Sequence, residues 1–257
     1  MANTVFANKV IEAKAKSLLA TRVNTRSLMT VDNELAENEG MTKTINVYSY
    51  TGKVEKLADG AKNTVRGSID FVGTDYTVQR AQQVFDYTDS EFMKDNSILD
   101  IMLKRANELM VNDMTADFVA EAQKATLTHE AGEFGYDAVV DAIQKLTLED
   151  ESQLFLLIPT AWKADLRKDP DYVAARMGEG VYNGHVGTVC GIPVIATNAL
   201  EDEANIMSKE AIKIFMKEDV EVEQDRDIET KTNTIVLSAY FICALVDNTQ
   251  ICKITKA

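Results

Sequence analysis

The sequence predicts an α+β protein with helices, a small sheet, and a long arm and hairpin that belong to neither. Residues 97–125 keep apolar side chains at helical spacing, with no Pro or Gly between them. Residues 42–84 are rich in strand-forming and turn-forming residues. Residues 235–246 are apolar at almost every position, which is typical of a strand that is covered on both faces.

The composition is that of a globular protein from a reducing compartment. The chain has 257 residues and is 46% hydrophobic, which suffices for a sizeable core. Its net charge of −14 argues against a general nucleic-acid binder. The start shows no apolar segment of a secretory signal, and the longest apolar run, residues 235–246, is too short for a membrane helix. Cys190, Cys243 and Cys252 form no CxxC pair, which favours reduced thiols in the cytosol.

Residues 1–41 are expected to form an N-terminal arm. Residues 4–20 have the pattern of an amphipathic helix, and a polar, broken segment follows them. Basic side chains gather in this arm, whereas the rest of the chain is strongly acidic: Lys9, Lys14, Lys16, Arg22 and Arg26. Because an arm of this kind usually packs on something else, we expect these cations to contact a neighbouring subunit.

Residues 42–84 are expected to form a long polar β-hairpin. Its centre offers only three large apolar residues, Val54, Leu57 and Val65, and an isolated hairpin is marginally stable in water. The hairpin therefore lies on the rest of the chain or on another chain, and we infer that its tip rests on a neighbouring subunit through polar contacts and edge hydrogen bonds. The charged residues expected to make these contacts are Lys53, Glu55, Lys56, Asp59, Lys62 and Arg66.

The remaining elements form the body. A long helix over 97–125, with Ser97 as its N-cap, would extend about 40 Å at 1.5 Å per residue. After it we expect a helix over 136–148, a buried strand over 153–158, a helix starting near Thr160, and a loop over 169–187. The later strands are expected in the segments "TVCGIPVIAT", "AIKIFMK", "VEVEQ" and residues 235–246. A tight turn at 247–249 would place Cys243 roughly opposite Cys252, where both are expected to be buried, reduced thiols.

The sequence offers few groups for catalysis. His129 and His185 are not at metal-ligand spacing, and no nucleotide-binding or nucleophile motif occurs, so we expect no enzyme activity, cofactor or metal. Residues 201–230 carry eleven acidic side chains against four basic ones. This acidic run is a cation site, a patch for a basic partner, a solvated strand face, or the surface that meets the basic arm of another subunit.

The order of these elements is similar to that of the major capsid proteins of tailed bacteriophages, which have the Hong Kong 97-type fold. The segments that carry the resemblance are "GTVCGIPVIATNAL" (187–200), "AIKIFMKEDVEVEQDRDIETKTNTI" (211–235) and "AYFICALVDNTQICKI" (239–254). The segment "TGKVEKLADG" (51–60) resembles the extended loop of that family. None of these segments is a catalytic signature.

The resemblance implies a shell protein of the virion capsid, synthesised and assembled in the cytoplasm of a bacterial host. Its domains would be an arm (1–41), an extended hairpin loop (42–84), a peripheral domain with the long helix as its spine (85–130 and 216–247), and an axial domain (131–215 and 248–257). Its copies would form hexamers and pentamers of an icosahedral shell that encloses double-stranded DNA without sequence-specific binding. No domain is expected ahead of the arm, so a separate scaffolding protein is implied, together with a portal protein at one vertex and no membrane.

Two other functions stay open at the level of the sequence. The shell proteins of bacterial nanocompartments, the encapsulins, share this fold and enclose cargo enzymes instead of DNA. A cytosolic α+β enzyme with an unrecognised site is the third alternative, and it would form a small oligomer rather than a shell.

Overall fold

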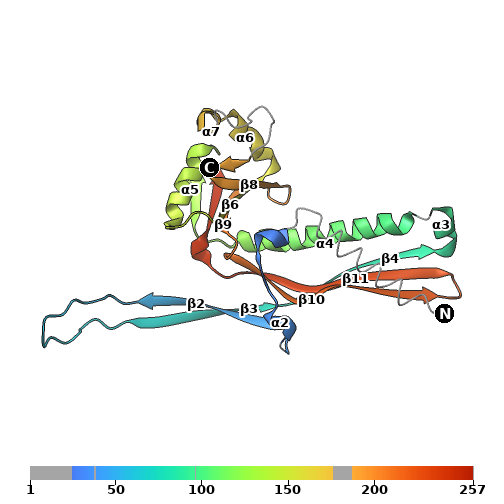
Figure 1. Cartoon of the computed structure of the whole chain (residues 1–257), viewed down its shortest axis with the longest axis horizontal. Helices are drawn as coiled ribbons and strands as arrows, with labels where there is room; N and C mark the ends of the chain where they lie inside the picture. Colours follow the sequence, from blue (N-terminus) through green and yellow to red (C-terminus); the bar gives the residue numbers. More distant parts are fainter. Residues whose placement is uncertain (1–24, 38, 96, 176–186, 257) are drawn as a thin grey trace.

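The computed structural model describes residues 25–37, 39–95, 97–175 and 187–256. Figure 1 shows an extended sheet beneath a long helix, a compact α/β part beside them, and a two-stranded hairpin that projects away from both. The helix expected over 4–20 lies outside the described residues. Among the helices of the described ranges, none has both the length and the apolar character that crossing a bilayer requires.

A four-stranded sheet forms the extended part, in the order β1-β10-β11-β4. Its strands are β1 (Thr30–Asp32), β10 (Ile212–Asp227), β11 (Thr232–Leu245) and β4 (Gln79–Thr88). The two strands expected within 211–224 are one continuous strand, β10, and that expectation was wrong. The pairing of β10 with β11 runs through both segments and absorbs the irregularity between Met216 and Glu221 as shifts of register.

Helix α4 (Ile98–Ala122) covers one face of this sheet, close to the bounds predicted for the long helix. Ser97 flanks its start as expected, but its hydroxyl donates to Asp95 Oδ1 at 2.6 Å instead of capping the helix. The side chains that interlock between the helix and β11 are almost fully buried: Leu103, Met110, Met114, Phe118, Ile235, Leu237, Ala239, Phe241 and Cys243.

The opposite face of β11 is covered at its C-terminal half. There Ala244, with Tyr240 and Ile242, packs against Leu35 of α2 (Glu34–Glu37) and against Ile45. This second layer explains why residues 235–246 are apolar at both alternating sets of positions. The outer half of β10, in contrast, alternates buried Val220 and Val222 with exposed acidic residues, so the acidic run includes the solvated strand face that was one of its possible interpretations.

The compact part contains a six-stranded sheet in the order β5-β12-β9-β6-β8-β7. Its strands are β5 (Thr128–Ala131), β12 (Ile251–Lys256), β9 (Glu203–Ser208), β6 (Leu154–Pro159), β8 (Ile192–Thr197) and β7 (Thr188–Val189). The helical elements of this part are α5 (Tyr136–Leu146), η2 (Thr160–Trp162), α6 (Lys163–Lys168) and α7 (Pro170–Ala175), and α5 and α6 contribute to the buried cluster on one face of the sheet. The loop expected over 169–187 is therefore wrong at its start. Pro170 begins α7, and the Asp169 carboxylate accepts the backbone N–H of Asp171 at 2.9 Å, as a residue ahead of a helix often does.

The hairpin consists of β2 (Thr42–Thr51) and β3 (Ser68–Thr77). It is shorter than the predicted 42–84, because residues 79–84 belong to β4 and pair with β11 as far as Phe241. Val78, which is 3% exposed, marks the point where the chain passes from the hairpin into the sheet. Elsewhere, short helices connect elements: η1 (Thr25–Leu28), α3 (Asp89–Lys94) and η4 (Asn248–Gln250).

The three cysteines are free thiols, as predicted, but Cys243 and Cys252 do not face each other. Residues 247–250 carry the chain from one sheet to the other through η4, and β12 pairs with β9 and β5 instead of β11. Cys243 is consequently buried beneath α4, and Cys252 in the core of the compact part.

Candidate inter-subunit surfaces

The hairpin is the part of the described chain with the least support from its own body. Its two strands pair only with each other, so both outer edges carry free backbone donors and acceptors. In Figure 1 the hairpin extends far beyond the four-stranded sheet and the compact part. A two-stranded hairpin that projects in this way is only marginally stable by itself in water.

The outer half of the hairpin presents an aromatic face. The register places Tyr48 opposite Phe71 and Tyr50 opposite Ile69, so these four side chains lie on the same face. All four are 64–69% exposed, and the rings of Tyr48 and Phe71 lie 6.1 Å apart. Sequence reasoning missed this face, since it considered only the centre of the hairpin. The alternation in "TINVYSY" could have revealed the two tyrosines, but their cross-strand partners depend on the register.

Two glycines close the aromatic face toward the tip. The Tyr50 hydroxyl lies over the backbones of Gly52 and Gly67, where an added Cβ would come within 2.4 and 2.7 Å of it. These are positions at which only glycine allows such a close approach. The tyrosine ring therefore lies along the hairpin toward its tip, while one face stays exposed.

The tip, residues 52–67, carries the charged residues that the sequence singled out. It turns at 58–61, where Gly60 has φ +85° and the Ala61 N–H donates to the Ala58 carbonyl at 3.0 Å. Glu55 has a partner within the tip: its carboxylate accepts from the backbone N–H of Thr64 at 2.9 Å and braces the loop internally. Its contact with a neighbouring subunit stays a prediction.

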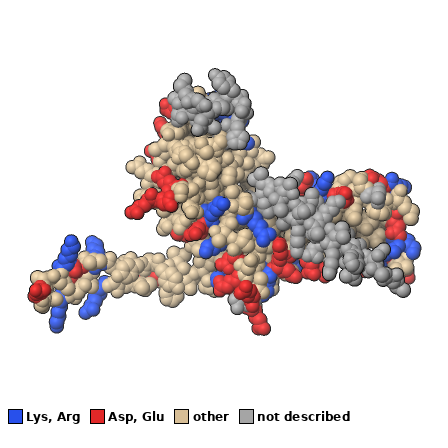
Figure 2. Space-filling model, viewed as in Figure 1, with Lys and Arg blue, Asp and Glu red and all other residues tan. Residues whose placement is uncertain are grey.

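The other charged tip residues are exposed: Lys53, Lys56, Asp59, Lys62 and Arg66. None of the ion pairs found within the described ranges involves the four basic ones. Figure 2 shows basic side chains projecting on both sides of the tip, at a distance from the acidic patches of the body. The tip thus offers unpaired positive charge to a negative surface.

The basic arm is described only in part. Lys9, Lys14, Lys16 and Arg22 lie outside the described residues. Arg26 donates to Asp219 Oδ1 of β10 in the same chain, with 3.3 Å between nitrogen and oxygen. At this position the arm meets the acidic strand within one subunit, and the contact of Arg26 with a neighbouring subunit stays a prediction.

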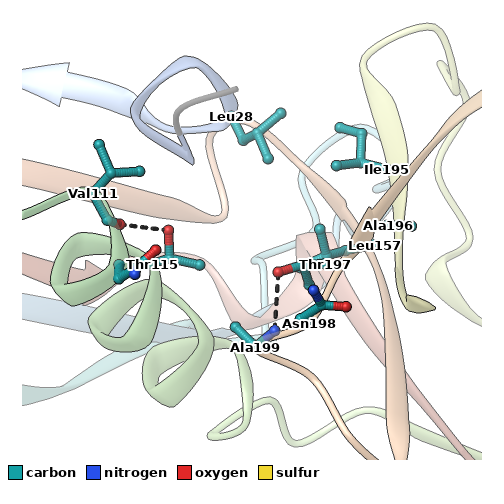
Figure 3. Close-up of a pocket in the computed structure, with 10 residues that line it drawn as sticks. Leu28, Val111, Thr115, Leu157, Ile195, Ala196, Thr197, Asn198 and Ala199 are labelled. Carbon is teal, nitrogen blue, oxygen red and sulfur yellow. Dashed lines mark hydrogen bonds between the residues drawn. The ribbon is translucent and has the colours of Figure 1, made fainter. Parts of the chain in front are cut away.

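A hollow of about 640 Å³ opens between α4, η1 and β8 (Figure 3). Leu28, Val111, Leu157 and Ile195 supply apolar surface, and two of the hydroxyl groups drawn beside them are engaged locally. The Thr115 hydroxyl donates to the Val111 carbonyl at 2.7 Å, and the Ala199 N–H donates to the Thr197 hydroxyl at 3.1 Å. None of the described residues that line this hollow is titratable, so they do not supply the groups that acid–base chemistry requires.

The described residues do not converge on a catalytic or metal centre either. No group of three or more His, Cys, Asp and Glu side chains comes together there as metal ligands. His129 lies on β5 instead of in a loop, with its Nε2 atom 4.0 Å from Asp141 Oδ2, and His185 is outside the described ranges. What stands out is a projecting hairpin with an aromatic face and a cationic tip, on a body that leaves both uncovered. This arrangement is typical of a structural protein rather than of an enzyme with a buried site.

Comparison with known proteins places the chain among capsid proteins. The sequence model of the family described as phage capsid protein matches residues 72–254, and the chain belongs to this family. The major capsid protein of Staphylococcus phage phiMR11 is 24% identical over 262 residues, covering 96% of this chain and 92% of that protein. The predictions of a capsid protein and of a place in the virion capsid are thereby confirmed.

Solved structures confirm the predicted Hong Kong 97-type fold. The capsid structure of cyanophage P-SCSP1u superposes with a TM-score of 0.70 at 12% identity, covering 90% of this chain and 86% of that one. The virus-like particle of Pyrococcus furiosus gives a TM-score of 0.67 at 14% identity, covering 96% and 99%. At these identities the likeness concerns the fold alone.

Proposed function

We propose that this chain is the major capsid protein of a tailed bacteriophage, and that its copies join through the hairpin into the hexamers and pentamers of an icosahedral shell. The observation that carries the proposal is the exposed aromatic face of Tyr48, Tyr50, Ile69 and Phe71, on the outer half of a hairpin whose strands pair only with each other. Apolar surface of this kind on a soluble chain marks an interaction site. The Staphylococcus phage relative, whose name is major capsid protein, supports the same function.

We infer that the two sheets correspond to a peripheral and an axial domain. Two separate clusters of buried side chains support this division, one between α4 and the four-stranded sheet and one around the six-stranded sheet. In this proposal we move the domain limits expected from the sequence to the bounds of the strands. Residues 128–130 belong with the axial sheet through β5, and residues 212–215 with the peripheral sheet through β10. The hairpin loop correspondingly ends at Thr77.

The shell in this proposal encloses double-stranded DNA. The net charge of −14 fits that role, because a negatively charged wall would not retain a nucleic acid that is driven into the shell. A separate scaffolding protein, a portal protein at one vertex, and assembly in the cytoplasm of the host belong to the same proposal. They are supported by membership of the phage capsid family.

The encapsulin alternative differs in cargo and not in fold. The Pyrococcus furiosus structure, 99% of whose chain is covered, is described as a virus-like particle and not as a phage capsid, and this observation keeps the alternative open. Particles purified from the native source separate the two functions: nuclease-protected DNA supports a phage capsid, whereas an enclosed enzyme supports a nanocompartment. An enzyme of the third class would instead elute as a small oligomer.

The proposal is tested by shortening the hairpin. Joining Thr51 to Ser68 through a short Gly-Ser turn removes the tip but keeps the last cross-strand pair, in which the two hydroxyls lie 2.7 Å apart. We expect an unchanged helical signal and thermal stability of the subunit, together with loss of shells in electron micrographs. A variant with Gly-Ser residues over the full length of the tip is the matched control for loop length. Normal shell formation by both variants would contradict the proposal.

A further inference from the structure

The hairpin leaves the body at a place where the four-stranded sheet loses a strand. Strand β4 pairs with β11 from Thr88 to Gln79, the partner of Phe241, and the chain then passes through Val78 into the hairpin. Strand β11 continues to Leu245 without β4 beside it. A backbone N–H on this side of β11 has no strand to accept it, and a buried donor of this kind needs another acceptor.

Glu121, in the last turn of α4, supplies that acceptor. Its Oε2 atom accepts the backbone N–H of Leu245 at 3.3 Å, and the residue is 8% exposed. The same oxygen accepts the hydroxyl of Tyr76 on β3 at 3.3 Å. One carboxylate therefore connects the spine helix, the free end of β11 and the root of the hairpin.

Lys124 completes the junction. Its Nζ atom lies 2.5 Å from Glu121 Oε1 and 5.7 Å from the centre of the Tyr76 ring. Burial raises the pKa of the Tyr76 hydroxyl, and the negative charge of Glu121 raises it further, so Tyr76 stays a hydrogen-bond donor throughout the neutral range. The carboxylate therefore has donors from β11, from β3 and from the turn that follows α4.

The position of Glu121 on α4 is unfavourable for a negative charge. Asp113, Asp117 and Glu121 follow one another at successive turns on one side of α4, and burial together with the two neighbouring carboxylates raises the pKa of Asp117. Like charges at this spacing repel each other. A buried charge that is retained despite such repulsion can serve to specify one geometry instead of adding to stability.

We propose that Glu121 is a positioning residue that fixes the direction in which the hairpin leaves the body. The inference rests on the proposed function, because the direction matters only if the hairpin must reach a neighbouring subunit. Tyr76 is paired with Lys43 across the hairpin, so holding Tyr76 holds both strands. Strand β3 has ten residues, and a tilt of about 10° at its root displaces its far end, about 34 Å away, by about 6 Å.

The attachment of the hairpin does not depend on Glu121. Its root packs through Ile45 and Val78 against Phe215, Ala244 and Leu35 on the opposite face of the sheet. Loss of the Glu121 contacts should therefore leave the hairpin joined to the body but free to tilt. This separation of attachment from direction makes the inference testable.

The experiment measures the direction of the hairpin in the unassembled full-length subunit. Spin labels are placed at Val54 in the tip and at Ile101 on α4, which are 96% and 59% exposed, in a background with Cys190→Asn. Asparagine suits Cys190 because this residue has φ +53°. We expect Glu121→Gln and Tyr76→Phe each to shift or broaden the distance distribution by about 6 Å or more, because Val54 lies beyond the far end of β3. Glu108→Gln, on the same helix, is the matched control and should leave the distribution unchanged.

The outcomes separate the inference from the function on which it rests. An unchanged distribution in folded Tyr76→Phe and Glu121→Gln subunits would overturn the role of Glu121, whatever the hairpin does in assembly. If Glu121→Gln fails to fold, Tyr76→Phe, which removes only a hydroxyl, still decides the matter. Failure of the proposed function would show elsewhere, as shells that form normally without the tip. We expect the double variant Glu121→Gln with Tyr76→Phe to behave like either single variant, because both substitutions break the same junction.

Discussion

Cys243 illustrates how a residue takes its chemistry from an element far away in the chain. Its side chain is 1% exposed beneath α4, where its Sγ atom lies 3.8 Å from the Met29 sulfur. Burial raises the pKa of the Cys243 thiol, and the carboxylates of Asp117 and Glu121 raise it further. Burial also raises the pKa values of Cys190 and Cys252. All three thiols are thus kept from forming the reactive thiolate.

We expect slow thiol chemistry in the native protein. A raised pKa lowers the thiolate fraction at pH 8, so Cys243 and Cys252 should react with a thiol reagent at least about tenfold more slowly than a free cysteine. Titration of native and denatured protein with a chromogenic disulfide checks this, and all three thiols should react after denaturation. Cys190, which is partly exposed, should be the first to react in the native state. Rapid native reaction of Cys243 would contradict its placement beneath α4.

Asp89 connects the outer ends of three strands and gives a prediction for acid pH. The hydrogen bond from Asn233, 2.9 Å from Asp89 Oδ1, lowers the pKa of this carboxyl, and Arg226 at 2.7 Å from Oδ2 lowers it further. A carboxyl whose folded pKa is depressed stabilises the fold above its ordinary pKa and loses that effect as the pH falls through the depressed value. Amide hydrogen exchange at the end of β11 should therefore quicken below about pH 4.

The Asp89→Asn variant tests this assignment. It should show fast exchange at the end of β11 already at pH 7, and its exchange should lack the acid-dependent step of the parent protein after correction for intrinsic rates. Asp70→Asn, on the exposed part of the hairpin, is the control. An acid step that persists in Asp89→Asn would assign the effect to another carboxyl.

Single residues were the least predictable level from the sequence. The tip cations could be selected from composition, since charge and turn residues are local properties. Glu121 could not, because its partners Tyr76 and Leu245 are 45 and 124 positions away and meet it only once β4 has diverged from β11. The internal hydrogen bond of Glu55 could not be predicted either, because its partner Thr64 comes within reach only after the tip has turned.

At the scale of elements, α4 and β11 carry the fold. Met114 and Phe118 on the helix and Ile235 and Leu237 on the strand are fully buried against the same cluster. Both elements were predictable, because their apolar periodicity extends over many residues. The short strands β5 and β9 were not predicted, since "THEA" and "EANIMS" mix polar and apolar residues without a clear period. Their pairing partners, which lie far away in the sequence, make them strands.

The contact between α4 and β11 predicts a large loss of stability for one substitution. Phe118 has no exposed surface, so Phe118→Ala should lower the free energy of unfolding by about 3–5 kcal/mol through lost burial and a residual cavity. Ile101 on the same helix is 59% exposed, and Ile101→Ala should change it by less than about 0.5 kcal/mol. Denaturant unfolding of unassembled subunits, followed by circular dichroism, measures both. Equal effects of the two substitutions would contradict the packing of α4.

At the scale of the whole molecule, charge and apolar surface are separated along the chain. The tip bears four basic residues against two acidic ones, whereas the chain as a whole is at −14. Behind the tip lies the uncharged aromatic face of the hairpin stem. A neighbouring copy with the same acidic body would first attract the tip and then bury the stem. Electrostatic attraction would thus act on the tip, and apolar burial on the stem.

This division predicts that salt acts on one part of the contact and not on the other. Ionic screening shortens the reach of exposed charges from about 10 Å at 0.1 M to about 3 Å at 1 M, but it leaves apolar burial intact. A variant with Lys53, Lys56, Lys62 and Arg66 all replaced by Glu should repel the acidic neighbour. We therefore expect it to form few shells at 0.1 M salt and to recover shell formation near 1 M, where the repulsion is screened.

The matched variant, Tyr48→Ser with Phe71→Ser, removes apolar area and leaves the charges in place. It should assemble poorly at both salt concentrations, because screening cannot replace the lost burial of two rings that are each 66% exposed in the isolated subunit. Light scattering of the assembly reaction, with electron microscopy of its products, distinguishes the two responses. If salt rescues the aromatic variant as well, the stem is not buried in the shell. If salt fails to rescue the charge variant, the tip does not face an acidic surface, and the order of attraction followed by burial is wrong.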